Sequence, residues 1–325
     1  MYCPRLEHYA RLNANGSIGM CGHMVKPKTF SSFEKMETSE WKRKLLNQMH
    51  NDIWPIECKR CKDTENIKQS SIRLDSIKRD KLLSKFRKDY IQLGGTLDNY
   101  CNSACVMCSE NLSTKIGNLK KHLVIKDNFD LYNSLPHDRI VELDVNGGEP
   151  SISINYNKLL DNIPSNVKII RINTNANRLI KQLKNILDKG ISVIITVSFD
   201  GIGQVHDYIR YPVKWKNFEK NLLTYRELVS KNKLLTLDTW TTVQALNINQ
   251  LNDIKEYCRK FEIRHEFALL ENPLPLNVKY KNKFTIKAKE QMPNNIAIDR
   301  DNTKELEAFL NLEESCRPSI ERFWI

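Results

Sequence analysis

The stretch Asp98-Asn-Tyr-Cys101-Asn-Ser-Ala-Cys105-Val-Met-Cys108 places three cysteines in one short loop, directly after a predicted strand at 91–97. Three thiolates in so tight a loop can bind three irons of a cubane cluster and leave the fourth iron without a protein ligand. A structural zinc ion instead needs a fourth ligand. His122 could supply it, although a single histidine flanked by lysine is more typical of a surface residue.

Around this stretch, from about residue 90 to residue 270, short apolar runs alternate with amphipathic helices. The predicted strands are 91–97, 139–146, 168–173, 192–198, 235–243 and 263–269, and the predicted helices include 178–189, 217–230 and 250–261. Such alternation is typical of a parallel sheet with right-handed crossovers. Six strands predict an α/β fold of the partial (β/α)6 TIM-like barrel type, rather than a closed barrel of eight strands.

Polar motifs follow four of the predicted strands. They are the cysteine loop, Gly147-Gly148-Glu149-Pro150, Asn173-Thr174-Asn175 and Ser198-Phe199-Asp200-Gly201. In parallel barrels the functional residues lie at the C-terminal ends of the strands. The four motifs are therefore expected to meet on one rim.

The second and third strands alternate apolar with polar side chains. The polar positions are Glu142, Asp144 and Asn146 in one strand and Arg171 and Asn173 in the next. Because the apolar faces must meet the outer helices, the polar faces are expected to point inward. Buried charges need partners, so Glu142 and Arg171 are expected to pair below the rim.

The C-x3-C-x2-C loop, combined with the GGEP, Asn-Thr-Asn and SFDG motifs, resembles the radical S-adenosylmethionine superfamily over residues 90–270. The resemblance implies a [4Fe-4S] cluster on Cys101, Cys105 and Cys108 that cleaves S-adenosylmethionine reductively to a 5′-deoxyadenosyl radical. That radical would abstract hydrogen from a substrate. A reducing electron donor such as flavodoxin or ferredoxin is implied as a partner. The chain departs from the family at Met107, where an aromatic residue usually precedes the third cysteine.

The resemblance also implies which residues contact S-adenosylmethionine. The backbone of Met107 would meet the adenine. The turn Gly147–Pro150 would receive the methionine amine, with Glu149 near its positive charge. Ser198 and Asp200 would lie near the ribose.

Three further residues complete the implied binding site. Arg210, in the segment His206-Asp-Tyr-Ile-Arg210, would bind the methionine carboxylate, which suits a bidentate guanidinium. Asn173 and Asn175 would reach the sulfonium or the ribose. Without the resemblance, Arg210 could equally be a surface arginine, and the two asparagines could simply form a turn.

A second set of cysteines, Cys3, Cys21, Cys58 and Cys61, precedes the predicted barrel. Four cysteines with one C-x2-C pair satisfy either tetrahedral zinc or a fully ligated iron–sulfur cluster. Their surroundings resemble the twitch (SPASM-like) auxiliary-cluster module of radical enzymes that modify peptides, sugars and cofactor precursors. In most of that family the module follows the barrel, whereas here it precedes it. The resemblance implies an auxiliary [4Fe-4S] cluster that accepts an electron when a peptide or small metabolite is oxidised or cross-linked.

These patterns divide the chain into three parts. Residues 1–88 are expected to form the twitch-like module with a connecting helix, 89–270 the barrel, and 271–325 a C-terminal extension. Residues 1–62 look irregular apart from one helix that begins after Thr38 or Ser39. The extension contains one predicted helix near 303–314.

The composition limits the function classes. With 40% hydrophobic and 28% charged residues among 325, the chain resembles a soluble globular protein. No apolar run is long enough to span a membrane, and Met1-Tyr-Cys-Pro-Arg begins no secretory signal, so a cytoplasmic location is expected. Nine cysteines in a reducing compartment favour metal binding or catalysis over disulfides. The net charge of +12 leaves an alternative, a zinc-stabilised nucleic-acid-binding protein, although lysines scattered along the chain favour a solvated surface.

Overall fold

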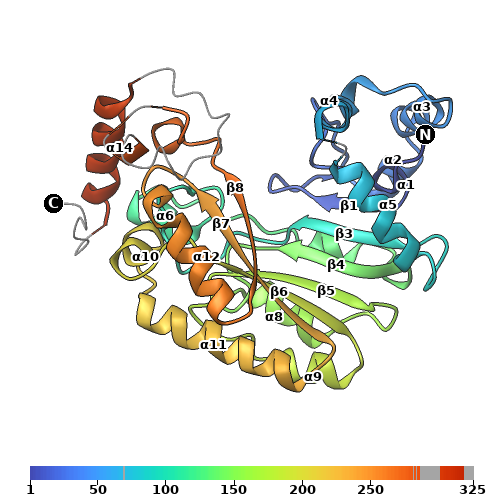
Figure 1. Cartoon of the computed structure of the whole chain (residues 1–325). Coiled ribbons are helices and arrows are strands. Elements are labelled where there is room, and N and C mark those ends of the chain that lie inside the picture. Colours follow the sequence, from blue (N-terminus) through green and yellow to red (C-terminus); the bar gives the residue numbers. More distant parts are fainter. Residues whose placement is uncertain (69, 281, 283, 286–300, 318–325) are drawn as a thin grey trace.

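The computed structural model describes residues 1–68, 70–280, 282, 284, 285 and 301–317. Its centre is an open eight-stranded sheet with the strand order β2-β1-β3-β4-β5-β6-β7-β8 (Figure 1). The strands are β1 (Tyr9–Leu12), β2 (Ile18–Gly19), β3 (Ile91–Thr96), β4 (Ile140–Asn146), β5 (Ile169–Thr174), β6 (Ser192–Ser198), β7 (Leu235–Val243) and β8 (Arg264–Leu269). Only the pair β1–β2 is antiparallel among these strands. The predicted α/β class and the six predicted strands are confirmed.

Helices flank the sheet and fill its connections. They are α1 (Pro4–Glu7), α2 (Phe33–Glu37), α3 (Glu40–His50), α4 (Lys59–Lys68), α5 (Ile72–Leu83), α6 (Thr114–Leu119), α7 (Phe129–Asn133), α8 (Ile154–Asp161), α9 (Leu183–Asp188), α10 (Gln204–Ile209), α11 (Trp215–Lys231), α12 (Leu251–Lys260) and α14 (Thr303–Ser315). Short 3-10 turns occupy η1 (Ile56–Cys58), η2 (His137–Arg139), η3 (Ile248–Gln250) and η4 (Leu274–Leu276). The predicted helices near 217–230, 250–261 and 303–314 are confirmed.

The predicted helix 178–189 is shorter than expected, because α9 begins only at Leu183. The Ile180 amide donates to the Tyr225 hydroxyl at 3.0 Å instead of to a helical carbonyl. Ala176, just before it, has a positive φ of 52°. A tertiary contact and a left-handed residue therefore replace the first helical turns that the apolar spacing predicted.

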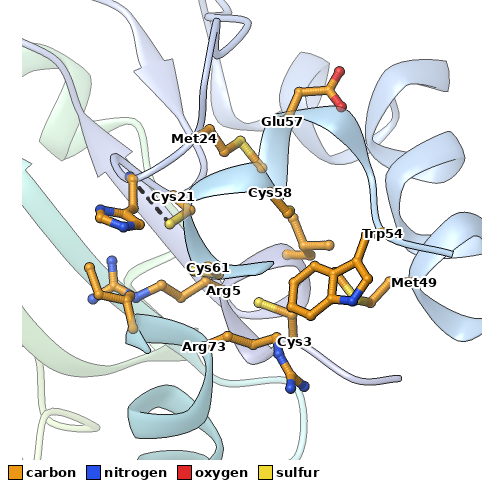
Figure 2. A pocket seen from close by; sticks show the side chains of 13 residues that line it. Cys3, Arg5, Cys21, Met24, Met49, Trp54, Glu57, Cys58, Cys61 and Arg73 are labelled. Carbon is orange, nitrogen blue, oxygen red and sulfur yellow. Dashed lines mark hydrogen bonds between the residues drawn. The ribbon is translucent and has the colours of Figure 1, made fainter. Parts of the chain in front are cut away.

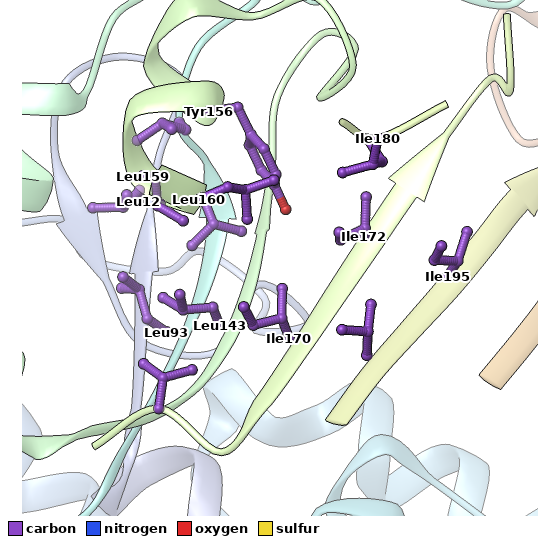
Figure 3. Close-up of a cluster of buried hydrophobic side chains, with 14 of the residues drawn as sticks. Leu12, Leu93, Leu143, Tyr156, Leu159, Leu160, Ile170, Ile172, Ile180 and Ile195 are labelled. Carbon is purple, nitrogen blue, oxygen red and sulfur yellow. The ribbon is translucent and has the colours of Figure 1, made fainter. Parts of the chain in front are cut away.

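The N-terminal residues are more regular than the sequence suggested, so the prediction that 1–62 is irregular is wrong. The antiparallel pair β1–β2 joins the large sheet, and Ala10 of β1 lies opposite Leu93 of β3 in parallel register. Leu12 packs in the same buried core as Leu93 and Leu143 (Figure 3). The connection at 63–88 contains parts of two helices, α4 and α5, rather than one.

The core lies between the sheet and the helices on its convex face. Leu143, Ile170, Ile172 and Ile195 are at most 1% exposed and belong to one buried cluster, to which α8 contributes Tyr156, Leu159 and Leu160 (Figure 3). Complete burial of each such side chain stabilises the fold by about 2 kcal/mol. The predicted alternation is confirmed from Leu143 onward in β4 and from Ile170 onward in β5, since these apolar positions enter this core, whereas Val141 packs in a separate cluster.

The polar positions of the same strands face the concave side. Glu142 is fully buried and accepts from Arg171 at 3.1 Å, as predicted. Arg79 of α5 forms a second, bidentate pair with Glu142 that the sequence did not indicate. None of the described helices has both the length and the apolarity to cross a bilayer.

We expect Gly95→Ala to destabilise the protein strongly. Gly95 has a φ of +102°, and a Cβ there would lie 2.1 Å from the Leu12 carbonyl oxygen. The strained backbone and the clash between β1 and β3 together predict a loss of about 3 kcal/mol in the free energy of unfolding, measured by urea denaturation.

Gly190→Ala is the matched control, because Gly190 has a φ of +76° but open space around its Cβ position. Gly190→Ala should lower the free energy of unfolding by about 1 kcal/mol, because it introduces backbone strain but no clash. Equal losses for the two variants would contradict the close contact between β1 and β3.

Candidate functional site

The predicted rim surrounds a cavity of about 310 Å³ at the C-terminal ends of the strands. The predicted residues that line it are Cys101, Cys105, Met107, Cys108, Gly147, Gly148, Glu149, Asn173, Asn175, Ser198 and Arg210. Pro150 and Asp200 are buried outside its lining. Ser103, Asn146 and Thr174, which belong to the predicted motifs and inward-facing positions, also line it, and so do Leu112 and Thr242, which were not predicted. The motifs therefore do meet on one rim.

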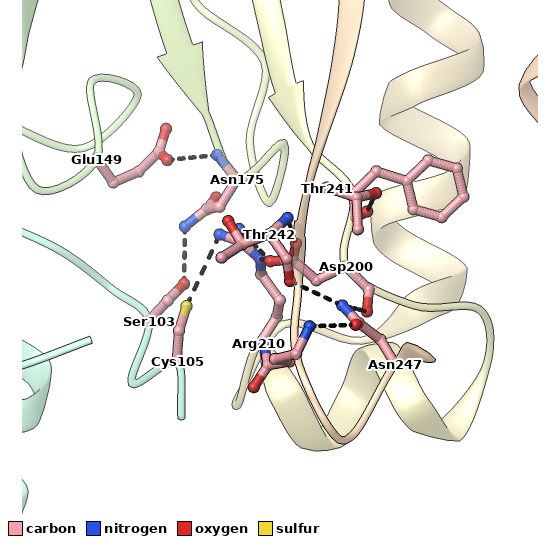
Figure 4. Close-up of polar contacts among 11 residues, drawn as sticks. Ser103, Cys105, Glu149, Asn175, Asp200, Arg210, Thr241, Thr242 and Asn247 are labelled. Carbon is pink, nitrogen blue, oxygen red and sulfur yellow. Dashed lines mark hydrogen bonds and ion pairs between the residues drawn. The ribbon is translucent and has the colours of Figure 1, made fainter. Parts of the chain in front are cut away.

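The cysteine loop is held in place by neighbouring segments. The Ala104 amide donates to the Tyr211 carbonyl at 2.6 Å, and the Asn175 side chain donates to Ser103 Oγ at 2.7 Å (Figure 4). Within the loop, the Cys108 amide closes a turn on the Cys105 carbonyl at 3.0 Å. The three thiols consequently open toward the cavity from a loop whose backbone is anchored.

The glycine turn touches the start of the cysteine loop. A Cβ on Gly148 would lie 2.4 Å from the Tyr100 carbonyl oxygen, and the Glu149 amide donates to that oxygen at 2.7 Å. Only glycine permits this backbone approach. Asp98, which is fully buried, accepts from the Tyr100 amide at 3.1 Å and from the Ser153 hydroxyl at the start of α8. The sequence analysis did not predict this structural role of Asp98. An aspartate whose side chain accepts from the amide two residues later is a common turn pattern, so the signal was present.

Glu149 was predicted to lie near the positive charge of the methionine amine, and in the structure protein groups bond to its carboxylate. It accepts from the Ser151 amide and hydroxyl at 3.1 and 2.7 Å, from Thr174 Oγ1 at 2.7 Å, and from the Asn175 amide at 2.7 Å. Burial raises the pKa of Glu149, and these hydrogen bonds oppose the rise. Glu149 therefore stabilises the junction of β4 and β5.

Arg210 and Asp200 form a buried ion pair beside the cysteine loop (Figure 4). Arg210 Nε and Nη2 donate to Asp200 Oδ2 at 2.7 and 2.5 Å, and the Thr242 amide donates to Asp200 Oδ1 at 2.7 Å. Arg210 Nη1 lies 3.8 Å from Cys105 Sγ. Burial raises the pKa of the Cys105 thiol, and the guanidinium opposes that rise.

The contacts of this pair bear on two expectations. Asp200 is fully buried with both carboxylate oxygens bonded, so it holds Arg210, and its place near a ribose stays a prediction. Arg210 lines the cavity as expected, but Asp200 already balances its charge. A surface role for Arg210 is excluded, since its side chain is only 11% exposed.

The second cysteine set also surrounds one cavity (Figure 2). Cys3 precedes α1, Cys21 follows β2, Cys58 ends η1 and Cys61 lies in α4. Trp54, Met24 and Met49 form apolar walls, while Arg5 and Arg73 supply positive charge. Glu65 accepts two hydrogen bonds from Arg73, at 3.0 and 2.6 Å, and holds it in place.

Thiols of both sets have raised pKa values. Burial, with repulsion from neighbouring thiolates, raises the pKa of Cys3, Cys58 and Cys108 to about 12. Thiols with such pKa values stay protonated near neutral pH unless a metal centre displaces the protons. Donor sets made only of sulfur suit iron–sulfur clusters or zinc.

No three His, Cys, Asp or Glu side chains in the described part of the chain meet at the spacing that a single metal ion requires. Each thiol set instead borders a cavity. The other two cysteines are separate from both sets: Cys258 is 1% exposed in the apolar core, and Cys316 caps the end of α14.

Comparisons with known proteins give only distant structural likeness. No protein-family model and no curated protein matches the chain. The solved structure of Streptococcus suis SuiB bound to S-adenosylmethionine is 14% identical, covers 91% of this chain and 72% of that chain, and has a TM-score of 0.45. Native anSMEcpe with bound AdoMet and Cp18Cys peptide is 15% identical, covers 64% of this chain and 55% of that chain, and has a TM-score of 0.38. Values of this size assign neither a family nor a function.

A double-mutant cycle should measure the coupling between Arg210 and Asp200. Arg210→Met alone leaves a buried carboxylate without its cation, and we expect it to lower the free energy of unfolding by about 3 to 5 kcal/mol in urea denaturation. Adding Asp200→Asn should recover a large part of that loss.

The exposed pair of Lys184 and Asp188 on α9 is the control. Lys184→Met should leave the denaturation midpoint unchanged, because exposed ion pairs contribute little. Additive effects of Arg210→Met and Asp200→Asn would rule out the coupling.

Proposed function

We propose that the chain is a radical S-adenosylmethionine enzyme whose [4Fe-4S] cluster is bound by Cys101, Cys105 and Cys108. The observation that carries this proposal is the placement of three thiols of one loop around a rim cavity of about 310 Å³. Three protein thiolates leave one iron of a cubane open for a chelating ligand. When bound, the cluster and S-adenosylmethionine would together supply a 5′-deoxyadenosyl radical, which is the chemistry of the cofactors and not of the side chains.

The side chains of the chain bind and orient these groups. Arg210 stabilises the Cys105 thiolate and, through Asp200, fixes the end of β6 against β7. The Gly147–Gly148 turn presents backbone atoms to the cavity, since the Glu149 carboxylate is already bonded. Ser198, Asn173 and Met107 remain as the lining groups that would contact the nucleoside.

The four-cysteine cavity is proposed to bind an auxiliary [4Fe-4S] cluster, in a twitch-like module formed by residues 1–88. Such a cluster would supply an electron acceptor for the oxidation or cross-linking of a peptide or small metabolite. Its support is the all-sulfur donor set and the adjacent cations Arg5 and Arg73. The same proposal assigns residues 89–270 to the barrel and residues 271–325 to a C-terminal extension. It also includes a reducing electron donor such as flavodoxin or ferredoxin. The net charge of +12 would favour an acidic donor.

Anaerobic reconstitution with iron and sulfide, followed by S-adenosylmethionine and a strong reductant, tests the barrel site. The wild type should release 5′-deoxyadenosine, detected by mass spectrometry. Cys105→Ala should abolish it, whereas Cys258→Ala, which removes a core thiol, should retain it. Iron-loaded wild type without 5′-deoxyadenosine would refute the proposal. Two zinc ions per chain, with nucleic-acid affinity that falls steeply with salt, would favour the nucleic-acid-binding alternative.

Metal analysis of Cys58→Ala tests the auxiliary site separately. The wild type should contain about eight irons, and the variant should lose up to about four of them while the barrel site still cleaves S-adenosylmethionine. Cys316→Ala should keep the full iron content. Unchanged iron in Cys58→Ala, or zinc in its place, would contradict an auxiliary cluster.

A further inference from the structure

A second and larger cavity, of about 530 Å³, lies on the concave face of the sheet next to the rim cavity. The two cavities share Asn173 and Ser198 in their linings. Apart from Ile194 and Trp240, the lining side chains of the larger cavity are polar or charged. The Arg264 and Glu266 side chains at its side are 66% and 50% exposed, so this polar surface is open to a polar ligand.

The register of the parallel strands determines which of these side chains are neighbours. Asp238 of β7 lies opposite Arg264 of β8, and Trp240 lies opposite Glu266. Asp238 and Trp240 are two residues apart on one strand, so their side chains leave the same face of the sheet. In Figure 1 these two strands form one side of the concave surface.

Two carboxylates share one cation at this position. Arg264 is the only cation among the lining residues of β7 and β8; it donates to Glu266, and its charge also acts on Asp238. Asp238 Oδ1 is buried and has no hydrogen-bond partner among the described residues. Farther along the cavity, the Arg171 guanidinium donates a hydrogen bond to Glu142, so it is already paired. Because the partly buried Asp238 side chain lines the cavity, a ligand that brings a donor to this incompletely bonded carboxylate gains free energy.

Trp240 offers a second contact for the same ligand. Its side chain lines the cavity, and the residue is 38% exposed, which is unusual for a large aromatic ring on an inner sheet face. An indole ring attracts a cation over its face and also packs against an aliphatic chain. A carboxylate beside an accessible indole is an arrangement that binds an ammonium group on a hydrocarbon stem.

We propose that the concave cavity binds the substrate through an ammonium group, with Asp238 as its hydrogen-bond acceptor and Trp240 against its stem. This deepens the proposed function, because the rim cavity adjoins this one and the bound amine would present its neighbouring carbons toward the rim. The ammonium group can belong to a lysine side chain of a peptide or to a free alkylamine. Both sources share the recognised chemistry.

Isothermal titration of the full chain with small probes tests the proposal without any catalytic turnover. The probes are Nα-acetyl-lysine amide, its uncharged analogue Nα-acetyl-norleucine amide, Nα-acetyl-glutamate amide and n-pentylamine. The lysine probe should bind at least about tenfold more tightly than the norleucine and glutamate probes. Comparable or weaker binding of n-pentylamine identifies a peptide as the source, and tighter binding identifies a free amine.

Variants locate the binding. Asp238→Asn should weaken the lysine probe about tenfold, Trp240→Leu should weaken it several-fold, and Trp240→Phe should restore part of the affinity. Glu227→Gln on the exposed face of α11 is the control and should bind as the wild type does. Equal affinity for the lysine and norleucine probes, a preference for glutamate, or an unchanged affinity in Asp238→Asn would overturn the proposal.

Release of 5′-deoxyadenosine in the absence of substrate separates this proposal from the proposed function. Asp238→Asn should retain that release, because Asp238 does not line the rim cavity. Amine binding without S-adenosylmethionine cleavage would leave the ammonium site standing and remove the proposed reaction. S-adenosylmethionine cleavage without selective amine binding would support the proposed reaction and remove the ammonium site.

Discussion

The buried carboxylate of Glu149 connects the parts of the rim. Its hydrogen-bond donors come from the start of the β4–α8 connection, through Ser151, and from the end of β5, through Thr174 and Asn175. The Asn175 side chain then bonds to Ser103 in the cysteine loop. An ionised group removed from water is tolerated only where donors replace its hydration. The requirement to satisfy one carboxylate thus brings two strand ends and the cysteine loop into a single arrangement.

The buried pair of Asp200 and Arg210 acts from the other side of the same loop. Asp200 accepts from the Thr242 amide of β7, and Arg210 extends from the end of α10 to Cys105. The loop is therefore held between β5 on one side and the β6–β7 ends on the other. Its thiols face a cavity whose walls are already in position, so binding a cofactor there requires little reordering of the protein.

Much of this fold follows from patterns that are visible in the sequence. The strands from β3 to β8 are six to nine residues long, and in β3 to β7 the apolar positions mark the face that enters the core. The motifs at their ends meet because parallel strands share a direction. β1 and β2 could not be found in this way, since they span four and two residues. β1 gains its place by pairing with β3, about eighty residues later, and β2 gains its place by pairing with β1.

The roles of individual side chains were harder to predict than their location. Glu149 and Asp200 belong to motifs that predict a rim, but no local pattern shows that both carboxylates are buried with all oxygens bonded. Arg79 binds Glu142 across 63 residues, a distance at which spacing carries no information. Such pairings depend on tertiary burial, which decides whether a polar group is available to a ligand.

The position of β1 has a consequence for the two thiol sites. Cys3 and Cys21 lie just outside the β1–β2 pair, and Cys101 follows β3, the parallel neighbour of β1. The separation of the two thiol sites is therefore set by the backbone hydrogen bonds between β1 and β3. It does not depend on the number of residues that connect the two strands. A slip of one residue would turn Leu12 out of the core, so the register can change only in pairs. The distance between the sites along the strand direction is thus restricted to steps of roughly 7 Å.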